Sequence, residues 1–187
     1  MKNKELYKVV LLLGSNLPLG KMSPAMIIEE ADKEIIDALL PDYLEVGSLE
    51  EAASATEIVE TEPCGKFEEE NPPKFFNQVL SCITDKEPMD VLKETQRIER
   101  LFGRMRTYKE KGKVYQSRTL DIDILKAYKC PPADSTPDKK ADNVADKMAQ
   151  WVEIESNIPE LILPHPQIET RPFVKSLIEG ADKKQKQ

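Results

Sequence analysis

The groups in this sequence that most clearly suggest chemistry are two aspartates separated by one residue. Asp121 and Asp123 alternate with Leu120, Ile122 and Ile124. Because side chains alternate between the faces of a β-strand, this pattern predicts a strand with both carboxylates on one face, about 6 to 7 Å apart. At an effective dielectric constant near 20, two negative charges at that distance repel by roughly 2.5 kcal/mol, which a cation would relieve. Carboxylate oxygens suit Mg²⁺, although a solvated strand face with two acids explains the pair alone equally well.

A cluster of basic residues lies directly upstream of the aspartates, in a chain that is acidic overall. Glu110 is the only acid among them and Gly112 lies in their middle, which favours a mobile loop that carries cations over a bound polyphosphate. An ordinary solvated loop is the alternative. The adjacent aspartates favour a phosphoryl-transfer site, because that chemistry depends on positioning and charge. The basic residues are Arg104, Arg106, Lys109, Lys111, Lys113 and Arg118.

Apolar periodicity and chain-breaking residues predict the elements that must hold these groups. The predicted strands cover residues 7–13, 44–46, 57–61, 75–84, 120–125 and, at the periphery, 151–154. The predicted helices cover residues 24–40, 88–102 and 171–179, and the stretch between 46 and 57 is expected to be a turn or a helical loop. The order strand, helix, strands, helix, strand predicts an α+β fold, a ferredoxin-like sandwich with helices on one face of a mainly antiparallel sheet.

Length and composition limit the domain organisation and the partners. The chain has 187 residues, a net charge of −7 and a pI near 5.0. We expect a single domain over residues 1–187, with a surface insertion at about 129–150 and a disordered tail from about 180. The acidic balance disfavours nucleic acids and anionic membranes as partners, and no apolar run is long enough to span a bilayer. Without such a run or a signal-peptide pattern at the N-terminus, we expect a cytoplasmic location. Three cysteines without a paired spacing indicate reduced thiols.

Six motifs follow one another along the chain. They are Gly14-Ser15-Asn16; Thr61-Glu62-Pro63-Cys64-Gly65; Phe75-Phe76-Asn77; Gln96-Arg97-Ile98-Glu99 with Gly103-Arg104-Met105-Arg106; Arg118-Thr119-Leu120-Asp121-Ile122-Asp123-Ile124-Leu125; and Pro164-His165-Pro166 followed by Arg171 and Phe173. In this order they resemble the 6-hydroxymethyl-7,8-dihydropterin pyrophosphokinase family, and the fifth motif is the most specific. The resemblance implies transfer of pyrophosphate from ATP to the hydroxymethyl group of a reduced pterin, with release of AMP, in folate biosynthesis.

The resemblance also implies roles for the charged residues. Asp121 and Asp123 would hold two Mg²⁺ ions that bridge the triphosphate of the co-substrate ATP, and Asp121 would lie close to the attacking hydroxyl. Arg104 and Arg118 would stabilise the charge that develops on the transferred group. These four residues are the expected catalytic set.

The substrate-binding residues are implied in the same way. The pterin ring would lie between Phe75 and Phe173, with Asn77 at its polar edge and the backbone of Thr61 and Cys64 beside it. Stacking on both faces suits a flat heteroaromatic ring, although plain core positions would explain both phenylalanines. The residues implied on the ATP side are Leu92, Gln96, Glu99, Arg106, Ile124, His165 and Arg171. His165 is the chain's only histidine, and we expect it to contact phosphate rather than act as a base.

Two segments depart from the family pattern. Tyr115-Gln116-Ser117 stand where the family usually has Trp-Gly-Pro, after a loop that is longer than usual. Near the end of the chain, Phe173-Val174-Lys175-Ser176-Leu177 only partly match the usual Phe-Val-Leu-x-Pro-Leu. We therefore expect the contacts of the basic loop and the support of Phe173 to differ from those of the family.

Two other functions remain as alternatives. A metal-dependent nucleotidyltransferase of the polymerase β type also uses a Gly-Ser pair and an Asp-x-Asp pair, but on consecutive elements, whereas more than 100 residues separate Ser15 from Asp121 here. A non-catalytic RNA-binding module on a ferredoxin-like sheet would need exposed aromatic residues and a basic surface. Phe75 and Phe76 meet the first requirement only weakly, and the pI opposes the second.

Overall fold

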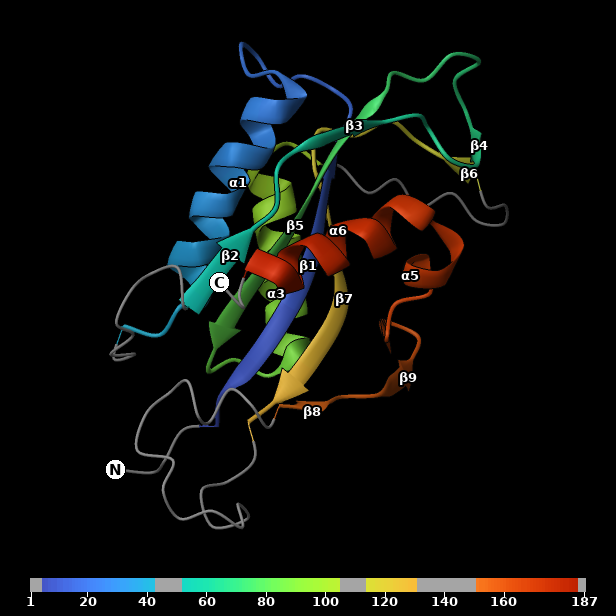
Figure 1. Ribbon diagram of the computed structural model, residues 1–187. Coiled ribbons are helices and arrows are strands. Elements are labelled where there is room, and N and C mark those ends of the chain that lie inside the picture. Colours follow the sequence, from blue (N-terminus) through green and yellow to red (C-terminus); the bar gives the residue numbers. More distant parts are fainter. Residues whose placement is uncertain (1–4, 43–51, 105–113, 131–150, 185–187) are drawn as a thin grey trace, which may run out of the picture.

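A six-stranded antiparallel sheet forms the frame of the molecule (Figure 1). The computed structural model describes residues 5–42, 52–104, 114–130 and 151–184. The sheet has the order β2-β5-β1-β7-β8, and β3 pairs with β5 as well. Its strands are β1 (Tyr7–Ser15), β2 (Ala53–Ala55), β3 (Val59–Thr61), β5 (Phe75–Thr84), β7 (Asp121–Lys129) and β8 (Val152–Glu153). With β1 between β5 and β7 and helices connecting the strands, the predicted α+β, ferredoxin-like fold is confirmed.

Two small strand pairs accompany the main sheet. β4 (Lys66–Phe67) pairs in parallel with β6 (Val114–Tyr115), and β9 (Ser156–Ile158) pairs antiparallel with β10 (Leu161–Leu163). None of these four strands is predicted from the sequence, because each is too short to show a periodic pattern.

The two long helices begin and end where their local sequences predict. α1 (Pro24–Leu39) starts after Ser23, whose hydroxyl accepts a hydrogen bond from the Met26 amide, and stops before Pro41. α3 (Pro88–Leu101) is terminated by Phe102 as its C-cap and by Gly103, which has a φ of +76°. Two further helices, α5 (Gln167–Thr170) and α6 (Pro172–Lys184), follow near the end of the chain. None of the described helices is both long and apolar enough to cross a bilayer.

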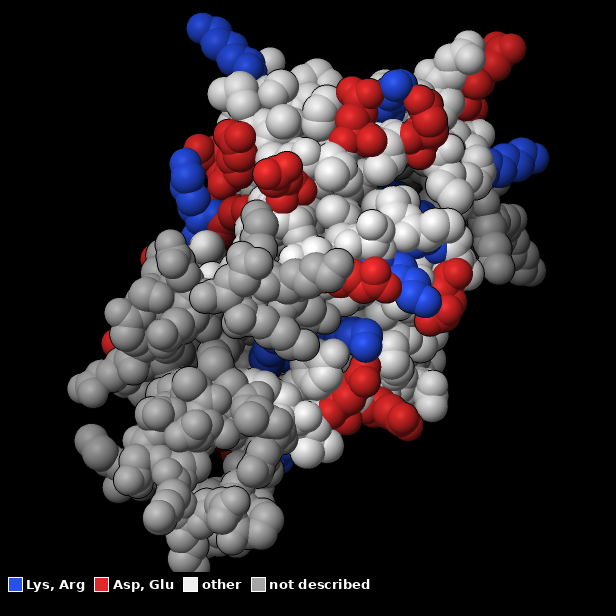
Figure 2. Space-filling model, viewed as in Figure 1, with Lys and Arg blue, Asp and Glu red and all other residues white. Residues whose placement is uncertain are grey.

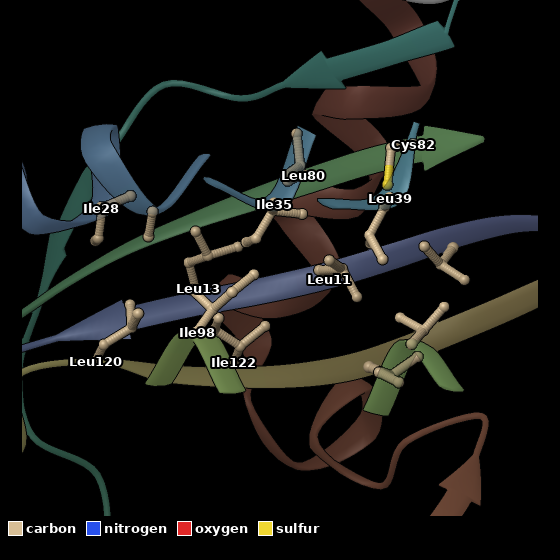
Figure 3. Packing of buried hydrophobic residues seen from close by; sticks show 14 of the residues in the cluster. Leu11, Leu13, Ile28, Ile35, Leu39, Leu80, Cys82, Ile98, Leu120 and Ile122 are labelled. Atoms are coloured by element: carbon tan, nitrogen blue, oxygen red, sulfur yellow. The ribbon is translucent and has the colours of Figure 1, made fainter. Parts of the chain in front are cut away.

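The main core lies between one face of the sheet and the helices α1 and α3 (Figure 3). The positions predicted from helical spacing are buried there, with Ile35 from α1 and Ile98 from α3 each 0% exposed. They pack against alternate residues of the central strands, such as Leu11 and Leu13 of β1 and Ile122 of β7. The apolar residues with strand spacing and those with helical spacing are therefore buried in the same core.

The opposite face of the sheet is also covered, because α6 crosses it in front of β1 and β5 in Figure 1. Val10 and Leu12 of β1 pack there against Val174 and Leu177 of α6. The expectation of helices on one face only was therefore incomplete. Its cause is visible in β1, which is apolar on both faces and needs cover on both sides.

Several boundaries differ from those expected. Residues 53–55 form a strand, not a turn or helical loop, because they pair with β5 through Ala53 and Cys82. β7 continues to Lys129 alongside β1. Helix α6 runs to Lys184, so the expectation of a disordered tail from about 180 was wrong for the residues up to Lys184. The expected strand at 44–46, most of the insertion at 129–150 and Arg106 lie outside the described residues.

Candidate active site

The site lies at the end of the sheet where β1 finishes and β5 and β7 begin. The strand register places Gly14 of β1 directly between Asn77 of β5 and Asp121 of β7. Leu12 of β1 is opposite Asp123, so the two aspartates share the face that α6 covers. The predicted strand with both carboxylates on one face is confirmed.

A cleft opens on this face, with about 410 Å³ of space that includes its open mouth. It brings together all five residues implied for pterin binding, three of the four implied catalytic residues and one residue implied on the ATP side. Its lining consists of Leu12, Gly14, Thr61, Glu62, Cys64, Phe67, Phe75, Asn77, Arg118, Asp121, Asp123, Arg171 and Phe173.

Arg104 reaches the aspartates because of how α3 ends. Gly103 adopts positive φ, its amide donates to the carbonyl of Arg100, and the Arg104 amide donates to the carbonyl of Glu99, which is the Schellman arrangement of a helix C-terminus. The Arg104 Nη1 then donates to Glu99 Oε1 at 2.6 Å and also contacts Asp121 Oδ1. Burial works against the charge on Arg104, but the carboxylates of Asp121 and Glu99 outweigh it and raise the pKa of the guanidinium.

Arg118 is held by the Gly-Ser-Asn motif at the end of β1. Its amide donates to Asn16 Oδ1 at 2.7 Å, and its carbonyl accepts from the Asn16 amide at 3.0 Å. Its Nη2 lies 2.6 Å from Asp121 Oδ2, and its Cζ lies 5.6 Å from the centre of the Phe75 ring. The Nε atom is buried and has no hydrogen-bond partner among the described residues. This guanidinium therefore retains a donor for an incoming anion.

Asp123 has a different partner from Asp121. Its Oδ2 accepts a hydrogen bond of 2.6 Å from Nε2 of Gln167. Burial and the charge of Asp121 raise the pKa of the Asp123 carboxyl, while His165, Gln167 and Arg118 partly offset this rise. An additional positive charge near this carboxylate would lower its pKa and favour its ionised form.

His165 lies beside the aspartates but not in the cleft lining. Its amide donates to the Leu125 carbonyl at 2.8 Å, which fixes the segment to β7. Its Nδ1 accepts a hydrogen bond of 3.2 Å from the Gln167 amide. Because that amide can only donate, the neutral imidazole carries its proton on Nε2. His165 can therefore donate a hydrogen bond to an anion through Nε2.

The other end of the cleft is aromatic. Asn77 Nδ2 donates to Thr61 Oγ1 at 2.8 Å, which fixes the amide beside the Phe75 ring. Phe67 lies between Phe75 and Tyr115, with ring centres 5.9 and 5.7 Å away. Sequence reasoning missed Phe67, and no periodic signal in its two-residue strand could have identified it.

The loop that carries Phe67 is fastened to the segment after the basic loop. Strand β4 pairs with β6, the Glu68 amide donates to the Tyr115 carbonyl at 3.1 Å, and Gln116 Nε2 donates to Glu68 Oε2 at 2.8 Å. The guanidinium of Arg171 lies 5.8 Å from the centre of the Tyr115 ring. Tyr115, which replaces the tryptophan usual in the family, thus lies beside two residues of the cleft lining, Phe67 and Arg171.

Besides His165, four residues implied on the ATP side do not line this cleft. Leu92, Gln96 and Glu99 lie on α3, and Ile124 is buried in the main core on the face opposite the aspartates. The Glu99 side chain is only 2% exposed, and its Oε1 accepts from Arg104 and from the Ile122 amide at 2.9 Å. In this structure Glu99 therefore positions Arg104 and the start of β7.

The donor atoms at the aspartate pair fit Mg²⁺. The available ligands are carboxylate oxygens, and Gln167 Oε1 nearby is buried without a hydrogen-bond partner among the described residues. Mg²⁺ prefers oxygen ligands and is commonly held by one or two carboxylates together with substrate phosphates. Asp121 and Asp123 would hold the ion, and neither sulfur nor nitrogen ligands are needed.

Comparison with known proteins agrees with the motifs. Residues 10–180 match the profile of the family described as 7,8-dihydro-6-hydroxymethylpterin-pyrophosphokinase. Two curated relatives, from Porphyromonas gingivalis strains ATCC 33277 and W83, are each named 2-amino-4-hydroxy-6-hydroxymethyldihydropteridine pyrophosphokinase. Each is 39% identical over 116 residues, which cover 62% of this chain and 60% of the relative. The chain belongs to the 7,8-dihydro-6-hydroxymethylpterin-pyrophosphokinase family.

Proposed function

We propose that the protein transfers the diphosphate of ATP to 6-hydroxymethyl-7,8-dihydropterin and releases AMP, as a step in folate biosynthesis. The hydroxymethyl oxygen loses its proton and forms a bond to the β-phosphorus, while the bond from that phosphorus to the oxygen bridging the α- and β-phosphates breaks. The observation that carries the proposal is a single cleft with aromatic and amide groups at one end and paired carboxylates and arginines at the other. The family assignment supports the same reaction.

The aromatic end would bind the pterin. Phe75 and Phe173 both line the cleft, and Asn77 presents an amide already fixed by Thr61. A flat ring gains from stacking, and a few polar groups fix its orientation. Cys64 lies at the same end and completes the set of residues in this role.

The charged end would bind and activate the triphosphate. Two Mg²⁺ ions on Asp121 and Asp123 would neutralise phosphate charge and orient the nucleotide for in-line attack. Arg118 and Arg104 converge on Asp121 and would contribute charge to the transferred group. Arg171 and His165 would contact phosphate, and the proposed nucleotide side also includes Leu92, Gln96, Glu99, Arg106 and Ile124.

The two alternatives receive no support from a specific observation. The separation of Ser15 from Asp121 along the chain is not valid grounds against a nucleotidyltransferase, because Gly14 pairs directly with Asp121 in the sheet. The family assignment argues against it instead.

An RNA-binding sheet face would have to be open, whereas α6 covers this one. On the face in Figure 2, the described acidic and basic side chains are interspersed, with no broad basic patch among them.

The direct test is to mix the protein with Mg-ATP and the reduced hydroxymethyl pterin and to measure AMP. We expect AMP and pterin diphosphate in equal amounts, and no AMP when the pterin is omitted. Asp123→Asn should abolish most of the turnover, whereas Asp37→Asn, at an exposed position of α1, should not change it. AMP formation without pterin, or full turnover by Asp123→Asn, would contradict the proposal.

A further inference from the structure

We propose that Gln167 is a positioning residue for the cation site, holding Asp123 through its amide nitrogen and turning its amide oxygen toward the water shell of the bound cation. The inference rests on the proposed function and extends it to a residue that the motifs did not single out. Gln167 follows Pro166 directly and forms the first residue of α5.

The nitrogen half of the amide is committed to the aspartate. Gln167 Nε2 lies 2.6 Å from Asp123 Oδ2, across 44 positions of sequence. A carboxylate can only accept, so the NH₂ group must face it and the carbonyl must point elsewhere. A hydrogen bond to a charged group is roughly twice as strong as one between neutral groups. The contact therefore fixes the rotation of the Asp123 carboxylate.

The oxygen half of the same amide lacks a protein partner. Gln167 Oε1 is buried and accepts no hydrogen bond from any described residue. A buried carbonyl that accepts no hydrogen bond destabilises the fold, so we expect a bound ligand to supply the donor for this atom next to the carboxylate pair. Water bound to a divalent cation is a strong donor, because the cation polarises its O–H bonds.

The backbone around Gln167 is anchored well enough for this role. The His165 amide is bonded to the Leu125 carbonyl of β7, and the Gln167 amide is bonded to His165 Nδ1. Ile168, the next residue, is 9% exposed and packs in the cluster beneath α6. The Arg171 amide donates to the Gln167 carbonyl at 3.0 Å. One helical turn thus ties His165, Gln167 and Arg171 to a fixed position against β7.

The test is direct cation binding by two variants of the whole chain. Mn²⁺ would stand in for Mg²⁺, and free Mn²⁺ would be measured by electron paramagnetic resonance, with and without a non-hydrolysable ATP analogue. Gln167→Met keeps the length of the side chain but removes both amide functions, and we expect it to weaken Mn²⁺ binding about 10- to 100-fold, as loss of an outer partner of a metal ligand typically does. Glu169→Met, on the exposed side of the same turn, is the matched control and should bind as the wild type does.

Turnover gives a second readout. In Gln167→Met we expect the Mg²⁺ concentration for half-maximal rate to rise, with kcat largely restored at saturating Mg²⁺, whereas Asp123→Asn should not be restored. Unchanged Mn²⁺ affinity in folded Gln167→Met would overturn the inference, as would equal losses in Gln167→Met and Glu169→Met. A wild type that binds Mn²⁺ more tightly than Gln167→Met does but forms no AMP would contradict the proposed reaction and leave the positioning role standing.

Discussion

At the scale of single residues, Asp121 is the centre of the site because both of its oxygens meet an arginine. Oδ1 contacts Arg104 and Oδ2 lies 2.6 Å from Arg118. The guanidinium groups are therefore already in position where a phosphate group would bind, so their side chains lose little conformational entropy on binding. Glu99 and Asn16 hold the two arginines from behind.

The first prediction concerns Arg118. Arg118→Ala should lower kcat by on the order of 100-fold or more, because removal of one donor that stabilises transition-state charge typically has this effect. Steady-state kinetics with both substrates varied would measure it. Arg97→Ala is the control, since Arg97 is paired with Glu94 on the exposed side of α3. A rise in the KM for ATP with unchanged kcat would instead make Arg118 a ground-state binding residue.

The second prediction concerns Phe173, which both lines the cleft and packs at the edge of the cluster beneath α6. Phe173→Ala should weaken pterin binding about 10-fold or more and ATP binding far less, since an aromatic stacking contact contributes roughly 1 to 3 kcal/mol. Calorimetric titration with each substrate would measure both. Ile178→Ala, which packs on the same cluster outside the cleft, should lower stability but not pterin affinity. Equal losses for the two ligands would favour a purely structural Phe173.

At the scale of elements, short pieces of secondary structure position the functional groups. The C-terminal turn of α3 presents Arg104, the end of β1 holds Arg118 through Asn16, and the single turn of α5 presents Gln167. The β4–β6 pair joins the Phe67 loop to Tyr115. Damage to one of these small elements should therefore affect substrate binding more than overall stability.

The third prediction follows from the packing of Gly65 against Tyr115. Gly65 has a φ of +104°, and an added Cβ would lie 2.6 Å from Tyr115 Cε2. Gly65→Ala must therefore displace the tyrosine ring and loosen the β4–β6 pair, and we expect the KM for the pterin to rise about 10-fold. Gly20→Ala is a matched control, with a φ of +59° but open space around its Cβ. If both variants lose the same stability and keep wild-type KM values, the loop contact does not support the cleft.

At the scale of the whole molecule, the central sheet is covered on both faces, and a carboxyl group is partly buried between α1 and the sheet. Asp32 faces the sheet near Gln78 and Cys82, and its Oδ1 is buried without a hydrogen-bond partner among the described residues. Burial raises the pKa of Asp32 from 3.8 to about 7, with Glu29 adding to the rise and the Gln78 amide opposing it. This carboxyl lies on the face opposite the candidate active site.

The fourth prediction is a pH dependence of stability. Below pH 3.8 the Asp32 carboxyl is protonated in both states; between 3.8 and about 7 only the folded state keeps the proton, so the free energy of unfolding falls as pH rises. Asp32→Asn should therefore stabilise the protein at pH 8, by on the order of 2 kcal/mol after allowance for partial solvation. Near pH 4 the gain should vanish.

Urea denaturation at the two pH values would measure this difference. Asp37→Asn, at an exposed position of the same helix, is the control and should give no pH-dependent gain. A gain of equal size at pH 4 and pH 8 for Asp32→Asn would show that packing, not ionisation, causes it.

The sequence by itself determined the local features of this protein. The alternation around Asp121 and Asp123 predicted β7 and the shared face of its carboxylates, and Pro24, Pro88 and Gly103 predicted the ends of the two long helices. These features follow from periodicity and backbone preference, which act over a few residues and are therefore readable along the chain.

Only the tertiary structure decided which distant groups meet. The register that pairs Gly14 with Asp121, the hydrogen bond from Gln167 to Asp123 and the contact of Phe67 with Phe75 each join segments that no periodic pattern connects. The same holds for Glu99, whose position in a helix is predictable but whose role in holding Arg104 is not. Such contacts depend on strand order and on α5 and α6 covering the second face of the sheet, which are set by the packing of the whole chain.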